Sequence, residues 1–98
     1  MIIKNVLSQL ETAAAPVAKI IQSSEYFKTF VIGLKKGMIW KEHKTAVQTR
    51  LLVVEGDVRY VENEKSVVLH KHDDMQIPVN ILHSLEAGED SLCFLIQG

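Results

Sequence analysis

Eight short runs of apolar and β-branched residues, separated by turn-forming residues, most strongly constrain what this chain can fold into. The runs cover residues 18–22, 26–34, 49–54, 58–61, 67–70, 75–77, 83–86 and 92–96. Turn signals lie at residues 23–24, 36–37, 55–57, 62–64, 72–74, 79–80 and 88–90, mostly 7 to 12 residues apart. Short strands at this regular spacing are typical of sandwiches and barrels. The sequence therefore predicts an all-β fold over residues 17–97.

The first sixteen residues differ from the rest because they have a helical pattern. Asn5 is a residue type that caps helices, and Val6, Leu7 and Leu10 follow on one predicted face before Pro16 ends the pattern. We expect one short helix in an extension that covers residues 1–16.

Two of the predicted strands are apolar on both faces, at residues 30–32 and 50–54. Both faces must then be covered, by a second sheet, the N-terminal helix or another subunit. A chain of 98 residues is long enough for one domain and has little else to bury such faces with. We expect a single compact barrel domain over residues 1–98 that forms a homodimer.

Composition and charge exclude several classes of partner. Eleven basic and twelve acidic side chains give a formal net charge of −1, so no basic surface for nucleic acid is expected. No run of eighteen apolar residues predicts a membrane span, and residues 1–5 do not resemble a signal peptide. The lone Cys93, between Leu92 and Phe94, is interpreted as a buried thiol of a cytoplasmic protein.

Two histidines lie in segments with a recognisable spacing. In the first segment, five residues separate Gly37 from His43, and the segment closes at Gly56. In the second, Pro78 is followed two residues later by Asn80 and three residues after that by His83.

These segments resemble the two motifs of the cupin superfamily. The first cupin motif reads Gly, five residues, His-x-His, three or four residues, Glu, six residues, Gly, and the second contains Pro-x-Gly-x-x-His. Asn80 replaces the second-motif Gly, and Asn also tolerates left-handed turns. The resemblance covers roughly residues 17 to 97 and implies a small antiparallel jelly-roll barrel, the double-stranded β-helix.

The resemblance also implies a metal site of three His and one Glu, from which this chain departs. Thr45 replaces the second His and Thr49 replaces the Glu, so that only His43 and His83 remain. On one strand, positions 43, 45 and 49 would share the inward face and position 48 would point outward.

Two interpretations of the pair stay open. A divalent transition metal (Zn, Fe, Mn or Ni) could be bound by His43 and His83 with water or substrate, although such metals usually take three or four protein ligands. Alternatively, both histidines are pocket residues hydrogen-bonded to Thr45, Thr49 or water. Trp40 and Met38 are interpreted as pocket wall or as core.

Three functions follow from these interpretations. The first is binding of a small organic molecule in the barrel pocket through His43 and His83, without a metal or with a weakly bound one. The second is a metal-dependent enzyme that resembles the cupin dioxygenases, isomerases or decarboxylases. The third is a dimeric interaction module with a vestigial pocket. The pair His70 and His72, beside two aspartates, is interpreted as a solvated loop.

Overall fold

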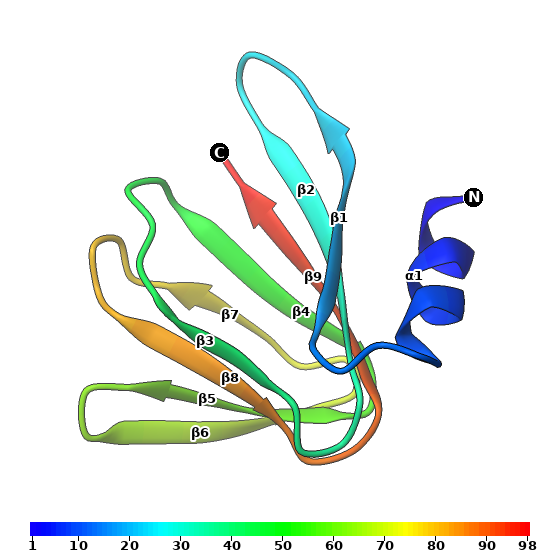
Figure 1. The fold of residues 1–98 in the computed structure, drawn as a ribbon. Helices are drawn as coiled ribbons and strands as arrows, with labels where there is room; N and C mark the ends of the chain where they lie inside the picture. Colours follow the sequence, from blue (N-terminus) through cyan, green and yellow to red (C-terminus); the bar gives the residue numbers. More distant parts are fainter.

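Nine strands form two antiparallel sheets that face each other in the computed structural model, which describes residues 1–98 (Figure 1). The elements are α1 (Ile2–Leu10), β1 (Val17–Ser23), β2 (Lys28–Leu34), β3 (Ile39–His43), β4 (Thr49–Glu55), β5 (Asp57–Glu62), β6 (Lys65–His70), β7 (Asp74–Ile77), β8 (His83–Ala87) and β9 (Ser91–Gln97). One sheet has the order β1-β2-β9-β4-β7 and the other the order β3-β8-β5-β6. The predicted all-β jelly-roll fold with one short N-terminal helix is confirmed.

Side chains alternate between the space enclosed by the sheets and the outside. In β4, Thr49, Leu51 and Val53 are buried, whereas Arg50 between them is exposed. The buried cluster between the sheets draws on β2 and β4 to β9, with Ile32, Leu51 and Leu85 among its members. Burial of this apolar area supplies the main driving force for the fold.

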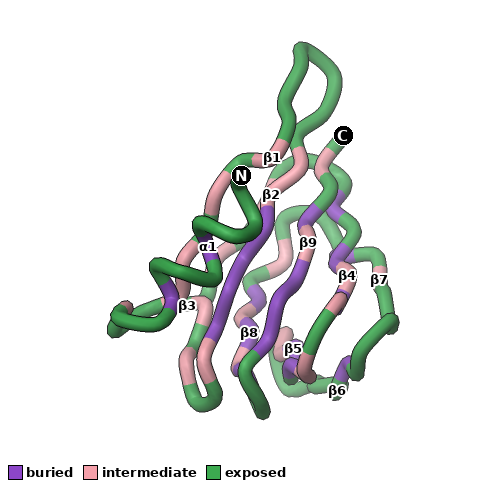
Figure 2. Tube along the Cα trace, turned by 90° about the vertical axis from the view of Figure 1, so that its right-hand side faces the viewer, coloured by how far each residue is buried: buried purple, intermediate pink, exposed green.

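Helix α1 covers the outer face of the larger sheet on the side of β1 and β2, as Figures 1 and 2 show. Val6 and Leu10, four residues apart on one helix face, are buried, and Val6 packs with Val31 of β2 and Leu92 of β9. Helix α1 therefore covers the outer apolar face of β2, one of the two strands that the sequence predicted to be apolar on both faces. At nine residues it is the only helix, and no helix here is long and apolar enough to cross a membrane.

The predicted cap of this helix is wrong. Asn5 lies inside α1, and its backbone N–H donates to the carbonyl of Met1 at 3.0 Å. The helix extends back to Ile2 because no Gly or Pro in its first turn stops it. Leu7, expected on the buried face, is half exposed.

Strand β3 was not among the predicted strands, because its alternation is interrupted. Trp40 lies opposite Leu85 of β8 and His43 lies opposite His83, so three steps along β3 match two along β8. This irregularity has the residue count of a β-bulge, which shifts every following side chain to the other face. Trp40 and His43 consequently share the inward face, although their spacing of three would normally separate them.

The expected common strand for positions 43, 45 and 49 is also wrong. Strand β3 ends at His43, Thr45 lies in the following loop, and Thr49 is the first residue of β4. The connection turns the chain from one sheet to the other, so alternation does not carry across it.

Candidate functional site

The inward-facing polar side chains gather at one end of the two sheets. His83 of β8 lies opposite His43 on one side and Glu62 of β5 on the other, and Thr49 lies opposite Gln97 of β9. Inward positions toward the other end of these strands are apolar, as in Val53 and Val58. This polar end is the candidate functional site, because convergent polar groups in an apolar setting mark ligand sites.

The loops that carry the two sequence motifs are joined directly. Asn80 adopts a left-handed conformation with φ of 59°, as expected for a residue that replaces Gly. Its backbone N–H donates to the carbonyl of Thr45 at 2.7 Å. This bond ties the loop before His83 to the loop after His43 and holds the two histidines at the same end of the molecule.

Backbone carbonyls fix the tautomers of both histidines. Nδ1 of His43 lies 2.9 Å from the carbonyl oxygen of Lys41, and Nδ1 of His83 lies 3.0 Å from that of Ile81. A carbonyl oxygen only accepts, so each Nδ1 carries the proton and each neutral ring presents Nε2 as an acceptor. Trp40 donates its indole N–H to Nε2 of His43 at 3.2 Å.

A row of rings crosses the site. The ring centroids of His43 and His83 lie 4.3 Å apart, and His83 stacks on Tyr60 of β5 at 5.6 Å. The Tyr60 hydroxyl donates to the carboxylate of Glu62. Burial, together with that bond and the charge of Glu62, raises the pKa of Tyr60.

His83 is the most enclosed member of this row, with 2% of its surface exposed. Burial lowers its pKa below 6.5, the proximity of His43 lowers it further, and the bond to Ile81 and the charge of Glu62 oppose the shift. His83 is therefore neutral at pH 7.

Tyr60 and Glu62 were not predicted as site residues. The sequence contains a signal for them, because Val58, Tyr60 and Glu62 alternate along one strand and therefore share one face. A carboxylate at the inward position of such a strand marks the polar end.

A cavity of about 240 Å³ opens beside His43, between β3 and the larger sheet. Its apolar lining comes from Ala18, Ile20, Phe30, Ile32, Trp40 and Leu95, and its polar lining from Lys19, His43, Thr45 and Gln97.

The residues expected in the pocket divide into three groups. His43, Thr45 and Trp40 line the cavity. His83 contacts the His43 ring but does not line the cavity. Thr49 is buried, and its hydroxyl lies 3.2 Å from the hydroxyl of Thr45. Met38 lies near Ala87, at the other end of β8 from His83, where it packs against the main core.

The threonines that replace the cupin metal ligands are hydrogen-bonded to other groups. Thr45 donates to the carbonyl of Val47 at 2.7 Å, and the Thr49 hydroxyl lies 3.2 Å from the same oxygen. Neither hydroxyl bonds to His43 or His83, whose partners are backbone carbonyls and Trp40.

The donor set does not fit the metal centre that the cupin resemblance implies. No group of three His, Cys, Asp or Glu side chains is placed to hold a metal ion. Of the two imidazoles that remain, His43 already uses Nε2 to accept the indole N–H. Because divalent transition metals are usually held by three or four protein ligands, two neutral rings form an incomplete site.

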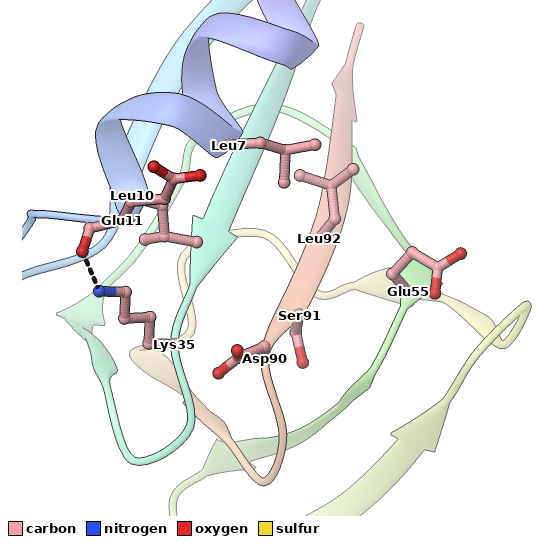
Figure 3. Close-up of a pocket in the computed structure, with 8 residues that line it drawn as sticks. All are labelled: Leu7, Leu10, Glu11, Lys35, Glu55, Asp90, Ser91 and Leu92. Carbon is pink, nitrogen blue, oxygen red and sulfur yellow. Dashed lines mark hydrogen bonds between the residues drawn. The ribbon is translucent and has the colours of Figure 1, made fainter.

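A separate cavity of about 310 Å³ lies between α1 and β9 (Figure 3). Leu7, Leu10 and Leu92 form its apolar part. Its polar rim is bonded within the fold, since Lys35 donates to the carbonyl of Glu11 at 2.6 Å and Asp90 accepts from the backbone of Lys36. No side chain of the polar end reaches this cavity.

The remaining chemically reactive side chains lie outside the polar end. His70 and His72 are exposed around the turn after β6. Cys93 is buried in the main core, and burial raises the pKa of its thiol to about 12. The thiol is thus protonated and unreactive at pH 7.

Comparison with solved structures identifies the architecture. An RmlC-like cupin from Desulfovibrio desulfuricans superposes with a TM-score of 0.80 at 18% identity, over 86% of this chain and 82% of that one. A cupin superfamily protein from Desulfitobacterium hafniense also gives 0.80, at 15% identity over 94% and 86% of the two chains. The chain has the cupin fold.

One of the similar structures is that of an enzyme. The DMSP lyase DddQ from Ruegeria pomeroyi gives a TM-score of 0.78 at 9% identity, and this chain spans 48% of its length. No protein-family model and no curated protein sequence matches the chain. At these identities the likeness describes the fold alone.

Proposed function

We propose that this cupin-fold protein binds a small organic molecule in the cavity beside His43, without a metal ion. The observation that carries the proposal is the convergence of four polar residues, Lys19, His43, Thr45 and Gln97, on a cavity of about 240 Å³ whose other lining residues are apolar. A few polar groups in an apolar lining are the usual composition of a small-molecule site.

The lining defines the class of ligand. The cavity lies just below the range of about 300–1,000 Å³ typical of drug-sized ligands, which favours a smaller molecule. Phe30 and Leu95 favour an apolar body. Because Nε2 of His43 is an acceptor, a ligand with a hydroxyl or N–H group at that end can bond to it.

His83 has a supporting role in this proposal. Its ring lies against that of His43, and its own Nδ1–H is held by Ile81. The His83 ring packs against the His43 ring and fixes its position. Because His83 is uncharged, it places no buried positive charge near the ligand donor.

Ligand-induced stabilisation tests the proposal. Small alcohols, amides and hydroxy acids would be screened by thermal shift, and a true ligand at a hundred times its Kd should stabilise the fold by about 2.7 kcal/mol. His43→Phe, which keeps a ring but removes both nitrogens, should abolish the shift. His70→Phe makes the same change at an exposed histidine and should preserve it.

The proposal fails if no compound stabilises the wild-type protein, or if His43→Phe leaves the shift of every stabilising compound unchanged. A substrate turned over in a metal-dependent reaction would instead support the enzyme interpretation.

A further inference from the structure

Trp40 and His43 stand between two cavities. Besides the 240 Å³ cavity, both residues line a depression of about 390 Å³. The other residues around this depression are Ala15, Pro16, Ile39, Lys41 and Glu42, which come from the segment before β1 and from β3. The two side chains therefore form a shared wall, which exists because the β3 irregularity places Trp40 and His43 on the same face.

Trp40 and His43 are also joined by a hydrogen bond to Nε2 of His43, the acceptor to which the proposed ligand would donate. With Nδ1 of His43 bound to Lys41, its Nε2 has a single lone pair, and the indole N–H of Trp40 occupies it. A ligand donor cannot reach this lone pair while the indole remains bonded to it.

We propose that Trp40 determines which ligands the site accepts, as a side chain that a ligand carrying a hydrogen-bond donor displaces from His43. Displacement frees Nε2 for the ligand and joins the 240 Å³ cavity to the 390 Å³ depression. Ligands without a donor leave the indole in place and are confined to the smaller cavity. This inference rests on the proposed function and adds the polarity and size selection to it.

The chain offers a direct measurement, because Trp40 is its only tryptophan. A ¹H–¹⁵N spectrum contains one indole N–H resonance, whose position reports the hydrogen bond to His43. His43→Phe should move this resonance upfield, whereas His70→Phe, the exposed control, should leave it in place.

Two probes of similar size distinguish the effect of a hydrogen-bond donor from the effect of the apolar ring. Cyclohexanol carries an O–H donor, and methoxycyclohexane has the same ring without one. Cyclohexanol should move the indole resonance upfield in the wild-type protein, toward its position in His43→Phe. Methoxycyclohexane should bind without that upfield change.

Trp40→Phe tests the selection by affinity. The variant removes the competing N–H, so the preference for cyclohexanol over methoxycyclohexane, measured as a ratio of Kd values, should rise about fivefold. The ratio cancels the effect of the smaller ring, which both probes share.

The outcomes separate this inference from the proposed function. If cyclohexanol binds, yet the indole resonance does not move and the ratio in Trp40→Phe is unchanged, the role of Trp40 is overturned and the binding site stands. An indole resonance that His43→Phe does not shift also overturns it. If neither probe binds to the wild-type protein or to Trp40→Phe, the role of Trp40 is overturned, and the proposed function fails as well only if the thermal-shift screen finds no stabilising compound.

Discussion

His83 shows how a single residue can be predicted for its position and not for its environment. Its motif predicts a pocket residue near His43. In the structure it lies opposite His43 in β3, its ring stacks on Tyr60, and Glu62 lies opposite it in β5. Both neighbours come from β5, and the pairing of β5 with β8 depends on the whole sheet. Sequence spacing within a motif carries no information about such a partner strand.

The buried position of His83 predicts a pH dependence of stability. Its pKa is lowered in the folded state, so the unfolded chain binds the proton more readily below its ordinary value of 6.5. The stabilisation is therefore complete above pH 6.5 and is lost as the pH falls toward the folded-state pKa. Urea unfolding between pH 7.5 and about pH 5 should show this loss in the wild-type protein.

His83→Phe isolates this contribution, because it keeps an aromatic ring that does not titrate. Glu62 and His43, which face the ring, are present in both proteins. The free energy of unfolding should fall less steeply with acidification in His83→Phe, whereas His70→Phe should follow the wild type. Parallel profiles for wild type and His83→Phe would contradict the prediction.

At the scale of elements, strands formed by continuous apolar and β-branched runs were predictable and the interrupted strand was not. Strand β4 matched its prediction within one residue, because Leu51 to Val54 form such a run. In β3, the two charged residues after Trp40, Lys41 and Glu42, interrupt the alternation that would identify a strand. The register shift at these two residues also places Trp40 beside His43. The irregularity that prevented the prediction of β3 is therefore the one that forms the site.

The contact between α1 and β2 depends on the absence of a side chain at Gly33. A Cβ atom there would lie 2.9 Å from Cγ1 of Val6 and 3.2 Å from a methyl carbon of Leu10. Gly33→Ala should therefore lower the free energy of unfolding by about 1–3 kcal/mol, measured by urea denaturation.

Val6→Ala supplies the matched test of that mechanism, because it removes the atom that Gly33→Ala would meet. The double variant should cost at least about 0.5 kcal/mol less than the sum of the two single variants. Strict additivity would show that the contact with Val6 does not cause the loss.

For the whole molecule, turn spacing and the two motif frames were enough to predict the cupin fold. They could not predict which side chains of different sheets meet, since Gln97 and Trp40 border one cavity only through the closure of β9 and β3 around it. The homodimer and the cytoplasmic location stay predictions from the sequence. The fold also admits both metal-dependent and metal-free functions, so the donor set must decide between them.

The donor set predicts that protein purified without a histidine tag contains well under one transition-metal ion per chain. Two neutral imidazoles leave half of a four-ligand shell to water, and binding to His43 also requires that Trp40 give up its hydrogen bond. Elemental analysis after dialysis against zinc, iron, manganese or nickel salts measures the content directly. His72→Ala controls for exposed imidazole, because His72 lies in the turn after β6. Near-stoichiometric metal that disappears in His83→Ala and persists in His72→Ala would contradict the metal-free proposal and restore the enzyme interpretation.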